Sequence, residues 1–412
     1  PYRGLTQACD PKVLEWVRQE NEFTDHWFDQ KELAEQIAKL KAQKRRPLYT
    51  QIGVWNGKLT ATKPQDGNYK LVRLDRNMEN EELLFERDTV LNYTASSLCA
   101  CPNDQNLLMV HGLYDGDPRQ NILIIDCKQR KILSTIQNTF DATWSKTKAT
   151  AYYVDTISDS QAQTCRSRVC AYDVPSDTIR VLMEDQGNAI LGSVTVSSDR
   201  KHLMAEMMDD YSNFRYFAIE EESGEIFDLN QGKGMKLSYL DTIGDRHYFI
   251  SKENSTLGEV LAVKKGDTLS QAEVVRPEKT EVLNGGFVLN GTLYLTMMDN
   301  VSAKVLCLKP DGETEILLPT RFGTLSRCGR DENAVYFTFE SFAFPPVLLR
   351  FDGEKMEIVM RSSDESYPDV VVEQLFAPSK SDGKMIPYFM VHRKDIKPDG
   401  NNPTWIYGYG GY

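Results

Sequence analysis

The sequence predicts a mainly β fold, a seven-bladed β-propeller that follows a short helical segment. The first observation is a change of texture at Leu48, after which short apolar runs alternate with Asp, Gly, Asn and Lys turns as far as about Met360. The second is a strand unit that recurs at an almost constant interval. The third is a further strand element, which recurs once in nearly every interval.

The recurring unit is an apolar strand that ends in a polar turn residue. Its turn residues lie 43 to 51 residues apart, which matches propeller blades of four strands. They are Asp75, Asp126, Asp173, Glu220, Lys264, Lys309 and Asp352. A long two-sheet sandwich is the alternative, and the constancy of the period argues against it.

The second element is a polar turn that leads into an apolar strand, as at Asp104 before residues 107–110 and at Asp199 before residues 203–207. The two elements alternate regularly, so we expect the second to form the inner part of each blade. The expected blades span residues 48–87, 93–136, 138–186, 189–230, 235–277, 281–319 and 322–361.

Residues 11–45 predict two helices in front of the strands. Val13, Trp16 and Val17 begin an apolar pattern at roughly helical spacing, which Leu33, Ile37 and Leu40 continue. Lysines and arginines gather at the end of the second helix, where they complement the helix dipole, and Pro47 stops it.

The composition is that of an ordinary globular protein, with 41% hydrophobic and 26% charged residues. The formal net charge is −12, and an acidic surface repels phosphate backbones, so we expect no nucleic-acid partner. No apolar stretch of about 18 residues occurs, so we expect no membrane span. The N-terminus has no apolar signal region either, and a cytoplasmic protein is the expectation.

The eight cysteines form no C-x-x-C pair and no Cys/His cluster with metal-ligand spacing. We expect free thiols, buried or half-buried, in a reducing compartment. A disulfide between Cys165 and Cys170 on a loop is the alternative for that pair.

The segment after the strands follows another pattern. Residues 382–392 are typical of a turn followed by an alternating strand, and a second strand then runs into Tyr407-Gly408-Tyr409-Gly410-Gly411-Tyr412. This is typical of the first strands of an α/β-hydrolase sheet, up to the loop that builds half of an oxyanion hole. The expected domains are therefore a helical segment over 1–47, the propeller over 48–368 and the first strands of a hydrolase domain over 369–412.

Three stretches together resemble the prolyl oligopeptidase family of serine peptidases. They are residues 15–21 in the helical opening, residues 340–346 near the end of the propeller, and the pieces 376–380, 382–387, 391–394 and 407–412. The resemblance covers essentially the whole chain and is most specific over 375–412. It implies a cytosolic endopeptidase that acts on short peptides, often after proline, and that is a monomer when complete.

The resemblance also implies an arrangement. The helices would pack on the hydrolase domain, the propeller would cover the active site, and the Ser, Asp and His of the triad would lie downstream of the tyrosine-glycine motif. The second tyrosine of that motif, here Tyr409, would donate its hydroxyl to the oxyanion. Tyr412 stands where the family more often has Phe. No metal or organic cofactor is implied, because such a triad supplies its own nucleophile and base.

The search for triad residues in the sequence agrees with this, and for His392 the family resemblance implies a structural role. No G-x-S-x-G segment occurs, and the five histidines are His26, His111, His202, His247 and His392. None has Ser and Asp partners that the sequence can place, and we expect a structural role for His392. The chain alone is therefore expected to lack a triad, which leaves Tyr409 as its one candidate catalytic residue.

Two other functions stay open. One is cleavage after Lys or Arg, as in the oligopeptidase B branch of the family, where acidic residues such as Asp209 and Asp210 could attract basic peptides. The other is a stand-alone propeller that binds peptides or proteins. We also expect core packing for the aromatic residues of Phe140-Asp141-Ala142-Thr143-Trp144, at the start of a blade.

Overall fold

The computed structural model describes residues 11–42, 48–55, 58–65, 68–75, 77–86, 93–114, 120–137, 139, 141–159, 164–185, 189–210, 212–331, 333–364 and 367–408. The chain divides into two compact units, residues 1–46 and 47–412.

The first unit contains the two predicted helices, α1 (Pro11–Trp27) and α2 (Gln30–Ala42). Asp29 caps α2, because its Oδ1 accepts hydrogen bonds from the backbone N–H groups of Lys31 (2.9 Å) and Glu32 (3.1 Å). Neither helix buries a residue. Large apolar side chains of this unit are exposed, namely Leu14, Trp16, Val17, Phe23, Trp27, Phe28, Leu33, Ile37 and Leu40. No helix of the described segments is long and apolar enough to cross a membrane.

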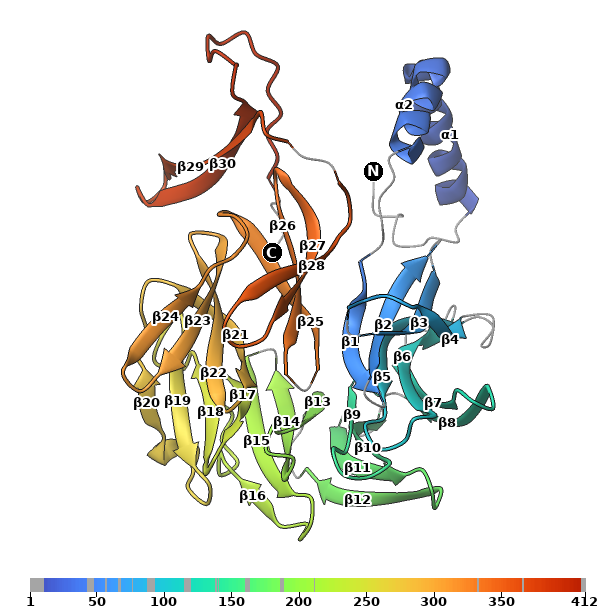
Figure 1. The fold of residues 1–412 in the computed structure, drawn as a ribbon, viewed down its shortest axis with the longest axis vertical. Coiled ribbons are helices and arrows are strands. Elements are labelled where there is room, and N and C mark those ends of the chain that lie inside the picture. The colour runs from blue at the N-terminus through green and yellow to red at the C-terminus, as the bar shows by residue number, and fades with distance from the viewer. Residues whose placement is uncertain are drawn as a thin grey trace. The chain divides into compact units, whose positions relative to one another are not determined.

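The second unit is built almost entirely from strands, which follow one another as antiparallel meanders of four (Figure 1). Two of these meanders are joined into one eight-stranded sheet. The meander at its start comprises β1 (Thr50–Trp55), β2 (Lys58–Gln65), β3 (Asn68–Leu74) and β4 (Glu82–Glu86). The meander at its end comprises β25 (Gly323–Arg330), β26 (Val335–Ser341), β27 (Phe344–Phe351) and β28 (Met356–Arg361).

Between these two meanders the described residues form five separate four-stranded sheets. The first contains β5 (Tyr93–Ala100), β6 (Leu107–Tyr114), β7 (Gln120–Asp126) and β8 (Lys131–Gln137). The next contains β9 (Ala142–Trp144), β10 (Thr150–Asp159), β11 (Thr164–Asp173) and β12 (Thr178–Glu184). It is followed by β13 (Leu191–Val196), β14 (His202–Asp210), β15 (Asn213–Glu220) and β16 (Ile226–Asp228). Then come β17 (Leu237–Ile243), β18 (Arg246–Ser251), β19 (Glu259–Lys264) and β20 (Glu273–Arg276), with a short 3-10 helix, η3 (Leu269–Gln271), before β20. The last contains β21 (Val282–Leu289), β22 (Thr292–Asp299), β23 (Ser302–Lys309) and β24 (Gly312–Ile316).

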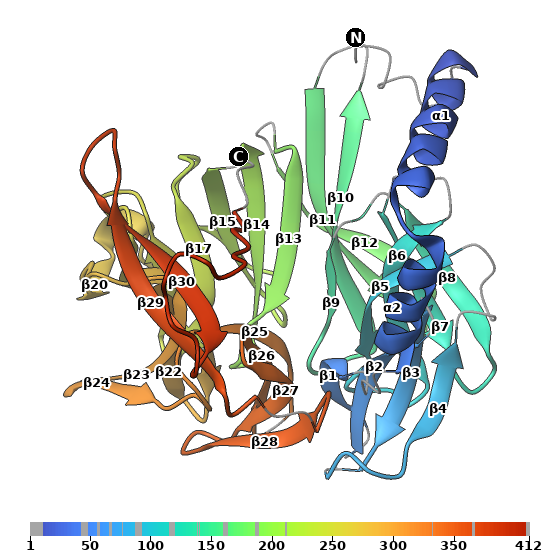
Figure 2. The same ribbon diagram turned by 90° about the horizontal axis from the view of Figure 1, so that it is seen from above.

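The middle strands of each meander carry the core. The recurring unit with the polar turn residue is the third strand of each meander, and the second recurring element is the second strand. In β6, for example, the first six residues are all buried, whereas β8 and β12 are mostly exposed. Figure 2 shows the fourth strands β4, β8, β20, β24 and β28 at the periphery of the unit. The first strand of each meander is therefore the innermost. The element that we expected to form the inner part of each blade is the second strand, which lies one position further out.

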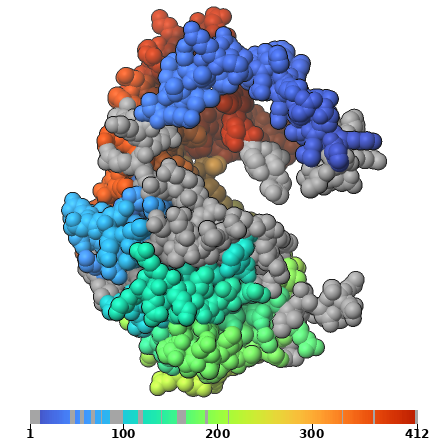
Figure 3. All heavy atoms as spheres, turned by 90° about the vertical axis from the view of Figure 1, so that its right-hand side faces the viewer, coloured from blue at the N-terminus to red at the C-terminus, as the bar shows by residue number. Residues whose placement is uncertain are grey.

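Consecutive meanders share hydrophobic clusters. Met109 and Ile124 of one sheet pack with Trp144 and Tyr153 of the next, and that next sheet shares a further cluster with β13–β16. Figure 3 shows the early meanders packed side by side in sequence order, from blue to green. Each remaining pair of consecutive meanders is joined in the same way. Most of the core therefore lies between sheets and not within any one of them.

The first and the last meander are also neighbours. Tyr49, Ile52 and Leu59 pack with Tyr336 and Leu348 in one cluster. The strands β1 and β25 run parallel and pair at Ile52 and Gly329. Gly329 has a φ of +155°, and a Cβ there would lie 2.0 Å from the carbonyl oxygen of Ile52. Only glycine fits this approach between the two backbones.

The cysteines agree with the expectation of free thiols where the structure describes them. Cys101, Cys170 and Cys307 are buried free thiols, and Cys99, Cys127 and Cys328 are half-buried free thiols. A bridge between Cys165 and Cys170 is excluded, because both lie on β11 rather than on a loop. Five residues of extended strand separate their Cα atoms by about 16 Å, far beyond the ~7 Å limit for a disulfide.

We expect Gly329→Ala to lower the free energy of unfolding by about 2–4 kcal/mol, because a methyl group must push β25 away from β1. Gly53→Ala is the matched control in β1, since its Cβ would meet nothing closer than Thr60 Oγ1 at 3.6 Å. That variant should lose less than about 1 kcal/mol. Urea unfolding followed by tryptophan fluorescence measures both, and equal losses would contradict the role given to Gly329.

A buried ion cluster gives a second prediction. Arg215 on β15 donates to Asp185 (Nη2–Oδ2 2.8 Å) and to Asp209 (Nη2–Oδ1 2.6 Å). Because Arg215 and Asp185 are both buried, Arg215→Met should cost about 3–5 kcal/mol of unfolding free energy by leaving a carboxylate unpaired. Arg246→Met, which breaks an exposed pair with Glu273, should cost less than about 1 kcal/mol. Thermal and urea unfolding of both variants measure the difference.

Candidate functional site

The C-terminal motif is described only in part. Tyr409, the predicted oxyanion donor, lies outside the described residues together with residues 410–412. The strand expected before it is not formed, because residues 394–408 contain no strand. Trp405, Ile406 and Tyr407 are 89%, 89% and 81% exposed. A strand needs a neighbouring strand for its backbone hydrogen bonds, and no described strand pairs with this segment.

The other expected strand before the motif is present. β29 (Val370–Pro378) and β30 (Met385–Arg393) form a two-stranded antiparallel sheet, in register from Val370 opposite Arg393 to Pro378 opposite Met385. Gly383, with a φ of +71°, turns the chain between them. Exposed apolar residues line this hairpin, namely Phe376, Met385, Ile386, Tyr388, Met390 and Val391. Such a hairpin is marginal by itself, so its contacts with the rest of the unit matter.

One ring anchors the hairpin to the meanders. Phe389 of β30 lies with its ring centroid 5.1 Å from that of Phe342 and 5.6 Å from that of Phe322. Phe342 belongs to the stretch 340–346, one of the three that carry the family resemblance. In addition, the amide of Gln374 on β29 donates to the carbonyl oxygen of Asn300. The hairpin is therefore attached to the turns beside β22 and β25.

His392 has structural partners. Its Nε2 lies 3.1 Å from Glu373 Oε2, and its Nδ1 lies 2.8 Å from the carbonyl oxygen of Arg393. These two contacts, the carbonyl first, raise the pKa of His392 above its usual value. Both ring nitrogens are occupied, so this histidine is not poised to take a proton from a serine.

A group of Ser197, Asp199 and His202 does occur in the turn between β13 and β14. The Ser197 hydroxyl donates to the Asp199 carboxylate, while His202 Nδ1 lies 3.1 Å from Asp199 Oδ2. Burial alone would raise the pKa of Asp199, but bonds from His202, Ser197 and Lys265 hold it well below its usual range. A triad needs the serine on the histidine. Here the serine and the histidine both donate to the carboxylate, so the group stabilises the turn between β13 and β14.

Two other histidines are buried and neutral at pH 7. Burial lowers the pKa of His111 to about 4, and burial with the neighbouring charges lowers that of His247 to about 4. His247 Nδ1 lies 2.7 Å from Thr242 Oγ1. A neutral imidazole paired to a threonine hydroxyl stabilises the core of its sheet.

Core packing was expected for the aromatic residues Phe140 and Trp144, before and at the end of β9. Trp144 is fully buried, and its Nε1 donates to the carbonyl oxygen of Cys99 at 2.9 Å, which confirms core packing for this residue. Phe140 lies outside the described residues. The acidic residues considered for basic peptides are occupied as well, since Asp209 pairs with Arg215 and Asp210 caps the turn at Ser212 and Asn213.

Asp141 and Glu206 form an acidic pair beside β9 and β13. Asp141 Oδ2 accepts a hydrogen bond from the Val194 backbone N–H at 3.3 Å, and the Tyr216 hydroxyl donates to Glu206. Burial raises the pKa of Asp141 to about 6, with a further contribution from the charge of Glu206. Burial likewise raises the pKa of Glu206. Sequence reasoning missed this pair, because the two residues meet only where β9 packs on β13 of the next sheet and β13 pairs with β14.

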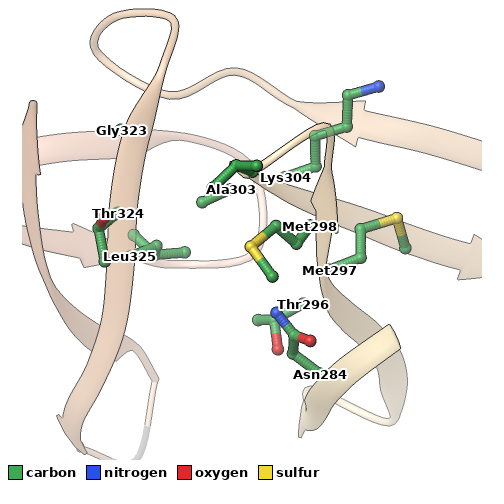
Figure 4. Close-up of a pocket in the computed structure, with 10 residues that line it drawn as sticks. Asn284, Thr296, Met297, Met298, Ala303, Lys304, Gly323, Thr324 and Leu325 are labelled. Atoms are coloured by element: carbon green, nitrogen blue, oxygen red, sulfur yellow. The ribbon is translucent and has the colours of Figure 1, made fainter. Parts of the chain in front are cut away.

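A small cavity of about 110 Å³ lies between the sheet of β21–β24 and strand β25 (Figure 4). Met298 and Thr296 line it from β22, and Thr324 and Leu325 line it from β25. It is smaller than the ~300–1,000 Å³ usual for ligand sites. A second hollow of about 430 Å³ adjoins it and is bordered by Phe322 and Gln374, where the hairpin is attached. Within the described ranges, no three His, Cys, Asp or Glu side chains are grouped to hold a metal ion.

Comparison with known proteins identifies the class to which this fold belongs. The family model for the prolyl oligopeptidase N-terminal β-propeller domain matches residues 1–363. This chain therefore belongs to the prolyl oligopeptidase family of peptidases, of which it contains the N-terminal propeller part.

Individual relatives agree. A prolyl endopeptidase from Elizabethkingia miricola is 22% identical over 462 aligned positions, which cover all of this chain and 61% of that protein. Oligopeptidase B from Trypanosoma brucei, with antipain covalently bound, has a similar structure, with a TM-score of 0.78 and 16% identity over 98% of this chain and 61% of that one. Prolyl oligopeptidase B from Galerina marginata, bound to a 25mer macrocyclization substrate, also has a similar structure, with a TM-score of 0.77 and 15% identity. The match covers 96% of this chain and 62% of that one. The chain thus spans about three fifths of the length of these relatives.

Asp141 gives a testable pH dependence. Its pKa in the folded protein, about 6, lies above the ordinary value of 3.8, so its contribution to stability is fully present below pH 4 and is lost as the pH rises through 6. Asp141→Asn should abolish this loss and gain about 1–3 kcal/mol over wild type at pH 7.5. Urea unfolding at pH 4 and pH 7.5 measures it. Parallel pH profiles of the two proteins would contradict the pKa given to Asp141.

Proposed function

We propose that this chain is the N-terminal part of a serine endopeptidase that hydrolyses short peptides after proline, with a propeller that selects substrates by size. The observation that carries the proposal is the family match over residues 1–363, together with meanders that follow one another over the same range. The name of the E. miricola relative favours proline at the cleavage position.

In this proposal the eight-stranded sheet counts as two blades, so the ring has seven. Every pair of consecutive meanders shares a hydrophobic cluster, and the cluster that contains Ile52 and Tyr336 joins the last meander to the first. A ring of this kind leaves a narrow axial channel. Set over an active site, the channel would admit short flexible peptides, exclude folded proteins and limit the access of bulk water.

The hairpin β29–β30 would be the start of an α/β-hydrolase domain over residues 369–412. Its exposed apolar side chains, such as Ile386 and Tyr388, support the addition of further strands and helices around it. The apolar residues of the helices, such as Phe23 of α1 and Leu40 of α2, would pack on the same domain. A free hairpin with these side chains would be an aggregation hazard, which argues against a stand-alone binding module.

Tyr409 would donate its hydroxyl to the oxyanion, and the glycines at 408, 410 and 411 would allow the tight turn that aims it. The Ser, Asp and His of the triad would lie downstream of Tyr412, so the 412 residues alone would be inactive. The reaction needs no cofactor, because the triad provides nucleophile and base. The complete protein would be a cytoplasmic monomer with peptide substrates and no nucleic-acid partner.

Cleavage after Lys or Arg is the second candidate, and the similarity to oligopeptidase B of T. brucei favours it. Against it, the acidic residues Asp209 and Asp210 are engaged with Arg215 and with a turn, so they do not offer free charge to a basic peptide.

In the longer gene product, Tyr409→Phe should lower kcat by about 10²–10³ with little change in KM, because the lost hydrogen bond acts mainly on the charged transition state. Tyr407→Phe is the matched control, since Tyr407 is exposed and is assigned no contact with the oxyanion, and its kcat should stay within about twofold. Hydrolysis of a proline-ended reporter peptide measures both. Equal kcat values in wild type and Tyr409→Phe would remove Tyr409 from the site.

Two further assays test the assignment as a whole. The longer product should cleave proline-ended but not arginine-ended reporters and should react with a fluorophosphonate, whereas the 412-residue chain should do neither. Cleavage of arginine-ended reporters alone would establish the second candidate. Fluorophosphonate labelling of the 412-residue chain would show that it contains a nucleophile after all.

A further inference from the structure

Basic side chains from different sheets converge where the first strands of the meanders end. Lys146 follows β9, Arg200 follows β13, and Arg327 and Arg330 lie at the end of β25, while the carboxylate of Asp241 comes from β17. We name these five residues the axial cluster. First strands face inward, and β1 and β25 run parallel. In the proposed ring, equivalent ends of the first strands therefore meet on one side.

One contact shows how close these ends come. Arg330 Nη1 lies 3.5 Å from Ser198 Oγ, a residue 132 positions earlier in the chain. The meander of Ser198 shares clusters with the sheets before and after it, and none with the meander of Arg330. Two sheets that are not neighbours can touch in this way only near the centre of the ring.

The carboxylate of Asp241 holds Ser198 in the position from which it contacts Arg330. Its Oδ1 accepts hydrogen bonds from the backbone N–H groups of Ser198 and Thr242, each at 2.8 Å, and its other oxygen accepts from the Ser198 hydroxyl. The Ser198 oxygen is thereby turned with its lone pairs towards Arg330. The carboxylate thus accepts three hydrogen bonds from Ser198 and Thr242, and it fixes the position of Ser198 instead of pairing with an arginine.

The cations of the cluster make no direct ion pair in the part of the chain that the structure describes, and Asp241 acts on Lys146 and Arg327 only from a greater distance. Among the described residues, no carboxylate lies within ion-pair distance of Lys146, Arg327 or Arg330. Burial lowers the pKa of Lys146, and the charges of Arg330 and Arg200 lower it further, although Cys99 and Asp241 act in the opposite direction. Burial and then Arg330 lower the pKa of Arg327.

This arrangement goes against the composition of the chain, whose net charge is −12. Four cations gather around one carboxylate, and three of them are arginines. The planar fork of an arginine matches a carboxylate with two parallel hydrogen bonds. Arg330 uses one N–H group on Ser198, which leaves other donors for a ligand.

We propose that the axial cluster binds a carboxylate group of a peptide, and that it therefore favours acidic peptides or the free C-terminus of a peptide on this side of the ring. The inference rests on the proposed function for the kind of ligand, since a peptidase meets peptides. It adds a preference that neither a proline nor a basic cleavage specificity supplies. Arg327 and Arg330 both lie on β25 with exposed side chains, so a ligand can reach them, and Ser198 holds one N–H group of Arg330.

The test measures binding, not hydrolysis, and uses the 412-residue chain. Three fluorescein-labelled octapeptides of otherwise equal sequence are compared by anisotropy at low salt. One carries two glutamates and an amidated C-terminus, one carries glutamines and a free C-terminus, and one carries glutamines and an amidated C-terminus. The proposal expects the first or the second to bind at least about tenfold more tightly than the third, and their order identifies which carboxylate is recognised.

The variants Arg327→Gln and Arg330→Gln should each weaken binding of the preferred peptide by about five- to tenfold, and the double variant more, with a shallower dependence on salt. Arg246→Gln is the matched control, because Arg246 is an exposed arginine of β18 outside the cluster and should leave binding within about twofold. Arg330→Lys should restore part of the affinity. Unchanged thermal unfolding midpoints establish that each variant is folded.

Equal affinity for the three peptides, or equal loss of binding in Arg246→Gln, overturns the inference. Inorganic phosphate that binds the cluster while no peptide does so also overturns it, since it would mark a simple anion site. These outcomes are separable from the proposed function. Hydrolysis of neutral proline-ended reporters by the longer product tests the peptidase assignment and does not require a carboxylate on the substrate.

Discussion

The close approach of two backbones at Gly329 and Ile52 is the constraint on which the second unit depends. It joins the last meander to the first, so that Tyr49 and Ile52 of the first meander pack with Tyr336 of the last. Each other meander buries its apolar residues against the next in sequence. Without this junction the terminal meanders would each expose one face that every other meander covers.

This architecture explains how the chain can combine a large core with charged residues near its axis. The second and third strands bury most of their side chains between sheets, so the first strands are free to carry polar residues towards the axis. Asp141, Glu206, Asp241 and the arginines of β25 all come from first strands, or from the strands and turns beside them. The core fixes the sheets, and the sheets in turn fix the distances between charges that are far apart in the sequence.

The fold could be predicted from the sequence to a large extent, because a propeller repeats its pattern. The turn residues from Asp75 to Asp352 mark the third strands, and both helices are present where expected. The prediction of a strand before Tyr407 was wrong. A strand needs a neighbouring strand for its backbone hydrogen bonds, and the sequence pattern does not reveal whether one is present. Tyr409 itself stays a prediction. The axial cluster was missed because Lys146, Asp241 and Arg330 are related only through the closure of the ring. The signal that could have found it is the position of each residue at the end of a first strand.

The junction at Gly329 also has a consequence for biogenesis. A ribosome completes the first meander long before it completes the one that covers Ile52 and Leu59, with more than 250 residues of chain between Leu59 and Gly329. Contacts that span such a length form late in folding and leave intermediates with uncovered apolar surface. During translation, the apolar surface around Ile52 and Leu59 would therefore stay exposed until the last meander is made. Chaperones that bind exposed apolar surface would have the longest time to bind at this place.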